Sequence, residues 1–245
     1  MLERLDGYRE LQVSDMSGLS RALASAGAVF QLKRLEVQIG EGGGAKGERR
    51  RDLGVAVTRL SNAMQSGNLA NLEELRVTGP VGGLRGFRAL CAALGSGNVS
   101  RLRSLSVGKG SRGVYGVAGM RSLAEAITAE SLPNLEKLCT FRSEITDQCV
   151  EALVEVWSNP VRSPLKSLLD LSFEFNPISP HGLTFLPRLL RSGNVPSLRE
   201  LSFCRCEELD APGCERPLTD VVKRPTRRSP QNLVVRGIAW GSEDE

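Results

Sequence analysis

One pattern, Leu-x-x-Leu-x followed by an apolar residue or, in one copy, Thr140, recurs along the chain and constrains the fold more than any other feature. Its copies start at Leu32, Leu72, Leu102, Leu135, Leu168 and Leu198. The steps between them are 40, 30, 33, 33 and 30 residues. Leu2-Glu-Arg-Leu5 is interpreted as a degenerate seventh copy. Self-similarity at a period of about 20 to 50 residues is typical of stacked repeat architectures.

A second set of apolar positions lies at fixed distances before each copy of the strand pattern. A leucine lies twelve residues before the strand leucine, at Leu60, Leu90, Leu123 and Leu186. A large apolar residue lies eight residues before it, at Met64, Leu94, Ile127 and Leu190. Positions four apart share one helix face, so each unit is predicted to be a helix followed by a strand. The unit that ends at Leu168 keeps the pattern with Leu153, Val156 and Trp157, but its connection has three extra residues around Pro160 and Pro164.

Three of these helices end in the same tripeptide, Ser-Gly-Asn, at 66–68, 96–98 and 192–194. The glycines stand where a helix closes its last turn with a residue at positive φ, so this conformation is predicted for Gly67, Gly97 and Gly193. Pro187 falls inside the last predicted helix. It predicts a helix that is kinked there or that starts late.

The run from Leu168 to Ile178 resembles the leucine-rich-repeat consensus LxxLxLxxNxL, with Asn176 at the asparagine. The last unit has Cys206 at that place, as ribonuclease-inhibitor-like repeats often do. The resemblance covers residues 2–209 and implies an α/β solenoid. This would be a curved horseshoe arc with parallel strands on the concave side and helices on the convex side. Other units have a different residue at the asparagine position, namely Gly40, Pro80, Gly110 and Ser143. These departures predict an incomplete ladder of side chains along this edge.

The chain divides at residue 209 in this interpretation. Residues 1–209 form an array of six to seven units with a glycine- and arginine-rich insert at 40–51. Residues 210–245 form a linker rich in proline and basic residues and a tail, in which the apolar stretch 232–240 is a candidate partial cap. The cluster from Lys223 to Arg228 is a candidate nuclear-import patch, and Ser229 before Pro230 is a candidate phosphorylation site.

Strand side chains alternate, so the residues between the core leucines should face the concave side. Those predicted to contact a partner are Arg34, Glu36, Arg76, Lys137, Phe141, Asp170, Ser172, Glu174, Phe175 and Glu200. Basic residues dominate the early units and acidic residues the late ones. Two interpretations stay open, a solvated face with incidental charges and a charge-graded docking surface anchored by Phe141 and Phe175.

The sequence offers few candidates for chemistry. Lys46 in the insert is followed by Gly47 and not by Ser or Thr, so the insert does not match the phosphate-binding loop motif. Gly40-x-Gly42-x-x-Ala45 is only a weak match to the dinucleotide-binding fingerprint. His181 has no serine or cysteine motif beside it. Cys204, Cys206 and Cys214 lack a fourth zinc ligand near in sequence. We therefore expect a flexible loop at the insert, and neither a metal, a cofactor nor an enzymatic activity.

The net charge, the N-terminal sequence and the cysteines bear on where the protein is located. The net charge of +4 is too balanced to argue for nucleic-acid binding. The charged N-terminus is no secretory signal, and no stretch approaches the roughly 18 apolar residues of a membrane helix. The six cysteines are then free thiols. We expect a location in the cytosol or nucleus, with no membrane association.

These observations favour a protein-interaction scaffold whose partner is another protein and not a small molecule. The alternative is a small-GTPase regulator, because Ran GTPase-activating proteins carry similar repeats. A third interpretation is the sensing end of an immune-type receptor, which would require a nucleotide-binding domain that this chain lacks.

Overall fold

The computed structural model describes residues 10–13, 31–38, 57–79, 81–108, 116–206, 209 and 213–238. The structural statements below concern these residues. Leu2-Glu-Arg-Leu5, the insert at 40–51 and the consensus departures Gly40, Pro80 and Gly110 lie outside them, so the predictions made for these segments stay predictions.

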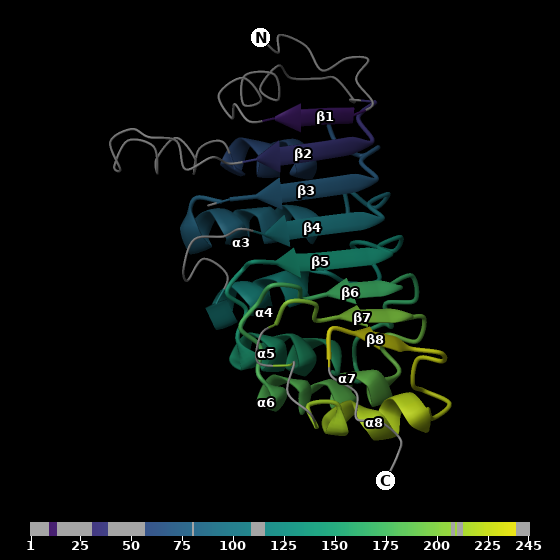
Figure 1. The fold of residues 1–245 in the computed structure, drawn as a ribbon. Coiled ribbons are helices and arrows are strands. Elements are labelled where there is room, and N and C mark those ends of the chain that lie inside the picture. The colour runs from purple at the N-terminus through teal and green to yellow at the C-terminus, as the bar shows by residue number, and fades with distance from the viewer. Residues whose placement is uncertain are drawn as a thin grey trace.

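The described strands form one parallel sheet in which spatial order equals chain order. They are β1 (Glu10–Val13), β2 (Arg34–Gln38), β3 (Glu74–Thr78), β4 (Ser104–Gly108), β5 (Lys137–Phe141), β6 (Asp170–Ser172), β7 (Glu200–Ser202) and β8 (Val234–Arg236). Figure 1 shows them stacked as a ladder with the helices along one side. This is a leucine-rich-repeat solenoid.

The helices alternate with the strands, as the double register predicted. They are residues 57–65, α3 (Gly83–Leu94), α4 (Gly116–Ala126), α5 (Asp147–Trp157), α6 (Pro180–Leu183), α7 (Leu186–Ser192) and α8 (Arg216–Lys223). Each packs on its neighbour along the stack, from α3 through α4, α5 and α7 to α8. A helix is about 10 Å wide and neighbouring strands lie about 4.8 Å apart, so the strand side is the concave side of such a stack.

The core lies between the sheet and the helices, and the repeated leucines fill it. Leu35 pairs in register with Leu75, and Leu138 with Leu171, so equivalent residues form rows across the sheet. All twelve leucines at the first two places of the six predicted strand copies are at most 3% exposed. Phe173 and Phe203 stack in the same layer, with ring centroids 5.7 Å apart. One unit cannot bury these side chains alone, because each row is covered by the units beside it.

The helix ends behave as predicted. Gly67, Gly97 and Gly193 have φ of 78°, 78° and 83°. The helix before β7 is divided into α6 and α7, and Pro187 lies in the first turn of α7. Proline is tolerated there because the first backbone N–H groups of a helix have no partner within it. The second of the two predictions for Pro187 is therefore confirmed.

Asn176 closes the turn after β5 and its own turn after β6. Its amide donates to the carbonyls of Thr140 at 2.6 Å and Phe173 at 2.9 Å. Its side-chain oxygen accepts from the backbone N–H groups of Ser143 at 2.8 Å and Ile145 at 3.2 Å. The asparagine of one unit thus completes the turn of the unit before it. Cys206 makes a weaker equivalent, donating to the Phe173 carbonyl at 3.4 Å.

The C-terminal stretch differs from the linker that its prolines suggested. Residues 216–223 form α8, and β8 pairs with β7 in parallel, with Val235 beside Leu201. Leu218 and Val221 of α8 are buried, as are Leu233, Val235 and Ile238 around β8. This stretch continues both layers of the solenoid. The described residues form eight strands where six or seven units were expected, and the strand that pairs with β2 is Glu10–Val13, a segment that the leucine pattern did not predict as a strand.

Candidate functional site

The strand face opposite the helices, here called the concave face, carries three rows of side chains. The register Arg34–Glu74–Ser104–Lys137–Asp170–Glu200–Val234 forms the first row. The second row is Glu36–Arg76–Ser106–Cys139–Ser172–Ser202–Arg236. A third begins with Gln38, Thr78, Gly108 and Phe141. These rows place eight of the ten predicted partner-binding residues on one face, and Glu174 and Phe175 follow β6. The charged members divide into two groups.

The first group lies at β2 and β3. Arg34 is exposed and forms an ion pair of 2.7 Å with Glu74 on the next strand. Glu36 is half-buried and stands beside the exposed Arg76 in the second row. Exposed ion pairs contribute little to stability, about 0 to 1 kcal/mol, so these side chains can be rearranged by a partner at small cost.

The second group lies on β5, β6 and β7. Lys137 is 3.7 Å from Asp170, and Glu200 accepts from Arg236 at 2.7 Å. Glu174, just beyond β6, accepts from the Ser202 hydroxyl at 2.9 Å. The structure thus places Asp170, Glu174 and Glu200 close together.

Small side chains occupy the second row from β4 to β7. Ser106, Cys139, Ser172 and Ser202 follow one another across four strands in the second row. The hydroxyls of Ser106 and Ser172 have no hydrogen-bond partner of ordinary geometry among the described residues. Both lie where they would stabilise a thiolate at Cys139, but burial has the larger effect and raises the pKa of that thiol.

The two predicted aromatic anchors have different surroundings. Phe141 is half-buried and lies over the neighbouring strand at Gly108, where an added Cβ would come within 2.6 Å of the ring. Phe175 is 40% exposed, and the Arg142 guanidinium lies 4.8 Å from its ring centroid. Phe175 is therefore the more available apolar contact on this face.

The charge gradient is weaker than the sequence suggested. Glu74 and Arg236, which were missing from the predicted set, neutralise Arg34 and Glu200 from adjacent strands. Arg142 was also missed. They could have been found by writing every unit in register, because each occupies a place equivalent to a predicted residue or one position beyond it.

His181 and the cysteines complete the set of titratable candidates. His181 is the second residue of α6. Its backbone N–H donates to the Ser179 hydroxyl at 3.1 Å, and its ring meets the Phe185 ring edge-on. All six cysteines are free thiols. Burial raises the pKa of Cys91 to about 12 and also raises that of Cys206. The described part of the chain has no group of three or more potential metal ligands, and none of its helices is long and apolar enough to cross a membrane.

A second feature, which the sequence did not predict, is a crevice between the loops that lead into β5 and β6. It has a volume of about 520 Å³ and continues into a smaller hollow of about 140 Å³. Apolar side chains make much of its wall, namely Ile127, Leu132, Leu135, Pro164, Leu165 and Leu168. It lies where both loops lack the Ser-Gly-Asn tripeptide and the second loop has three extra residues.

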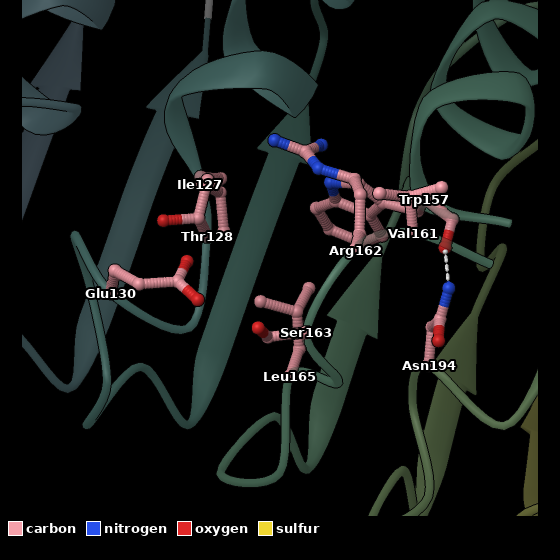
Figure 2. A pocket seen from close by; sticks show the side chains of 9 residues that line it. All are labelled: Ile127, Thr128, Glu130, Trp157, Val161, Arg162, Ser163, Leu165 and Asn194. Carbon is pink, nitrogen blue, oxygen red and sulfur yellow. Dashed lines mark hydrogen bonds between the residues drawn. The ribbon is translucent and has the colours of Figure 1, made fainter. Parts of the chain in front are cut away.

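The smaller hollow is drawn in Figure 2, with Glu130 and Ser163 facing it from opposite loops. Hydrogen bonding from Ser163 is the main cause that lowers the pKa of the exposed Glu130. At the other end, Arg162 donates to the carbonyls of Ala124 and Glu125, each at 3.0 Å. Val161 beside it is 90% exposed. The arginine is thus engaged with the end of α4, and the crevice has a mixed lining in which Glu130, Ser163, Lys166 and Ser167 stand beside the apolar residues.

Comparisons with known proteins give limited information. No protein-family model matches the chain, and no curated protein matches it. Among solved structures it is similar to the chain in "Crystal structure of TLR13-ssRNA13 complex", at 16% sequence identity and a TM-score of 0.28. The match covers 95% of this chain and 39% of that chain. The leucine-rich-repeat fold is therefore established by the chain itself, through its leucine register, its parallel strand order and the turn that Asn176 completes.

Proposed function

We propose that this chain is a protein-interaction scaffold that binds another protein on its concave face. One observation carries the proposal. The side chains between the core leucines of β2 to β7 point away from the core, and the helices of the described chain all pack on the other side (Figure 1). A broad, regular face with charged residues and an exposed aromatic suits a protein partner better than a small ligand, which needs a deep pocket.

The proposed binding set is the ten-residue set named from the sequence, with Phe175 as the main anchor. Aromatic and arginine side chains contribute most to protein interfaces, and Phe175 with Arg142 above it supplies both. Kinship with ribonuclease-inhibitor-like repeats is also part of the proposal. It is supported by a full helix in most units and by Cys206 at the asparagine position.

We propose binding without catalysis. The thiols of Cys91, Cys139 and Cys206 are poor nucleophiles because burial raises the pKa of each. His181 is exposed at a helix start and contacts Phe185. A partner that is itself an enzyme, such as a small GTPase, is compatible with a docking role.

An affinity pull-down from cell lysate tests the proposal. The full chain is compared with a variant carrying Phe141→Ala, Phe175→Ala and Glu174→Lys. A control variant carries Val117→Ala and Glu125→Lys, two exposed positions on α4 on the helix side. We expect proteins that the parent and the control capture and the triple variant does not. Identical captures by all three would place binding away from the concave face and overturn the proposal.

A further inference from the structure

We propose that the basic side chains at the C-terminal end of the solenoid bind the phosphate backbone of a nucleic acid. Five residues form this surface, here called the basic edge: Arg191, Lys223, Arg224, Arg227 and Arg228. They lie at the C-terminal ends of α7 and α8 and on the loop after α8, and not among the strand residues of the concave face. The inference is therefore independent of the proposed function and assigns a second class of ligand to a second surface.

The basic edge combines two segments that are neighbours in the stack. α7 packs on α8, and β7 pairs with β8, so the two helices lie side by side at the end of the ladder (Figure 1). Arg191 lies in the last turn of α7, and Lys223 lies in the last turn of α8. The Arg228 side chain lies over Gly193, the residue that ends α7, where an added Cβ would be 3.6 Å from the Arg228 Cβ. The two segments therefore form one continuous surface.

No carboxylate interrupts the positive charge of these segments. Residues 186–199 and 221–233 contain seven Lys and Arg residues and no Asp or Glu. Seven positive charges exceed the net charge of +4, so the rest of the chain is net negative. All five side chains of the basic edge are exposed, and its four arginine side chains have no ion pair in the described part of the chain. The balanced total charge thus conceals a local excess of cations.

A fixed turn presents Arg227 and Arg228. The Ser229 N–H donates to the Thr226 carbonyl at 3.1 Å, and the hydroxyl oxygens of these two residues are 2.9 Å apart. The Gln231 amide donates to the carbonyls of Thr226 at 3.0 Å and Ser229 at 2.9 Å. Ser229 is 3% exposed, whereas the two arginines before it are exposed. Because the backbone of the turn is already ordered, an anion that contacts these arginines would bind at a small entropic cost.

The helix ends explain only part of this charge. A cation in the last turn of a helix is favourable because the C-terminal end of a helix is partially negative, and this accounts for Arg191 and Lys223. It does not account for Arg224, Arg227 and Arg228, which follow the last residue of α8. Like charges this close in sequence repel one another, and a bound anion would relieve that repulsion.

The surroundings favour a nucleic acid over a protein as the ligand. Protein interfaces have an apolar centre with aromatic anchors. Neither segment contains an aromatic residue, and the exposed large hydrophobic residues of the described chain lie elsewhere, at Val117, Val161, Phe175 and Val234. A guanidinium binds a phosphate through two parallel N–H donors, and such contacts release the counterions of a nucleic acid. Without aromatic side chains to stack on bases, the binding should be independent of base sequence.

The test is fluorescence anisotropy of a fluorescein-labelled oligouridylate titrated with the full chain. We expect binding at low salt, with a slope of about −3 for log K against log salt if about four phosphates are contacted. Oligocytidylate should bind within about twofold of oligouridylate. Labelled polyglutamate should bind about tenfold more weakly, because its lower charge density releases fewer counterions. A failure to bind oligouridylate would overturn the proposal, and so would equal binding of polyglutamate, which would indicate an acidic protein as the ligand.

Variants then locate the site. Arg227→Gln combined with Arg228→Gln should weaken oligouridylate binding about tenfold and reduce the salt slope by about 1.4. The matched control combines Arg85→Gln with Arg88→Gln, two exposed arginines on α3, and should bind like the parent. Arg191→Gln, on the preceding unit, should weaken binding about threefold. The urea midpoints of both double variants should match the parent, because the side chains are exposed, and this separates lost binding from lost folding. Equal losses in the two double variants would reduce the effect to net charge and overturn the proposal.

Discussion

Two kinds of loop lead from helix to strand in this solenoid, and they connect neighbouring units differently. In the Ser-Gly-Asn loops, the serine hydroxyl caps its own helix, as Ser96 does on Ala93 at 2.7 Å. The asparagine reaches the preceding unit: Asn98 donates to the Gln65 carbonyl, and Asn194 donates to the carbonyls of Trp157 at 2.7 Å and Asn159 at 2.9 Å. Asn194 also lies at the edge of the smaller hollow, on the side away from Glu130.

The loops before β5 and β6 lack the tripeptide. Here the hydrogen bonds between neighbouring units come from long side chains. Arg162 and Trp157 of the later unit donate to the end of α4, where both reach the Ala124 carbonyl at 3.0 Å. The crevice opens between the same two loops. The comparison teaches that each unit must satisfy the carbonyls that end the helix before it. Asn194 binds the carbonyls at the end of α5 from a short loop. Arg162 binds those at the end of α4 from a longer connection, which leaves the crevice beside it.

The largest effect is expected for Asn194→Ala. Asn194 is 7% exposed and its two bonds go to carbonyls near the end of α5. Their loss should lower the free energy of unfolding by about 2 to 3 kcal/mol, because buried carbonyls would be left unpaired. Urea denaturation followed by circular dichroism measures this change. A loss below about 0.5 kcal/mol would contradict a connecting role for the asparagine.

A smaller effect is expected for Arg162→Ala. The guanidinium is partly exposed and water can replace it, so the loss should be about 1 to 2 kcal/mol. Arg162→Lys should recover only part of it, since a lysine cannot serve the two carbonyls in the same fork. Lys166→Ala at the rim of the crevice is the matched control and should be neutral. A full rescue by lysine would reduce the role of Arg162 to its charge.

A third test concerns the glycine of the tripeptide. Gly97 has φ of 78° with nothing near a new Cβ, so Gly97→Ala should cost about 1 kcal/mol from backbone strain alone. Gly95, two residues earlier, has φ of −71°, and Gly95→Ala should change stability by less than about 0.5 kcal/mol. Thermal unfolding of the pair gives the difference directly. Equal losses of stability in Gly97→Ala and Gly95→Ala would contradict a requirement for glycine at the positive φ of residue 97.

The smallest effect is expected for Asn98→Ala. Asn98 makes one bond to the preceding unit from an exposed position, so the loss should be at most about 0.5 kcal/mol. Comparison with Asn194→Ala in the same urea titration sharpens the contrast, because the two residues occupy the same place in the tripeptide. A loss as large as that of Asn194→Ala would mean that burial does not determine the strength of these connections.

Residues that repeat in register were predictable, and residues that interact across units were not. The strand leucines, Gly67, Gly97, Gly193 and Asn176 have the roles expected of them because each follows from position within one unit. The apolar stretch 232–240 covers the last predicted unit, as expected of a candidate cap, but it was not recognised as a repeat strand because Val235 is the only large apolar residue of β8 at a core place of the pattern. Register places Asn232 and Gly237 where Leu198 and Phe203 stand.

The candidate site shows the same division. Its face was predictable from strand alternation, as Arg34 and Lys137 illustrate. Its charge pairing was not, because the partners Glu74 and Arg236 are fixed by the register between neighbouring strands. The crevice had a signal in the three extra residues near Pro160 and Pro164, but that signal could not distinguish a bulged loop from a hollow.

The strict order of the sheet has a consequence for how the chain acquires its structure. Each strand pairs only with the strands before and after it in the chain, and the side-chain bonds between units span 28 to 40 residues. Among the described residues no bond of this kind joins distant units, so folding can start at any well-packed pair of units and spread to its neighbours. During synthesis, each interface can form once about one more unit has left the ribosome. Unfolding can likewise begin in the unit with the weakest connection, which makes the loops around the crevice a place to look for its first step.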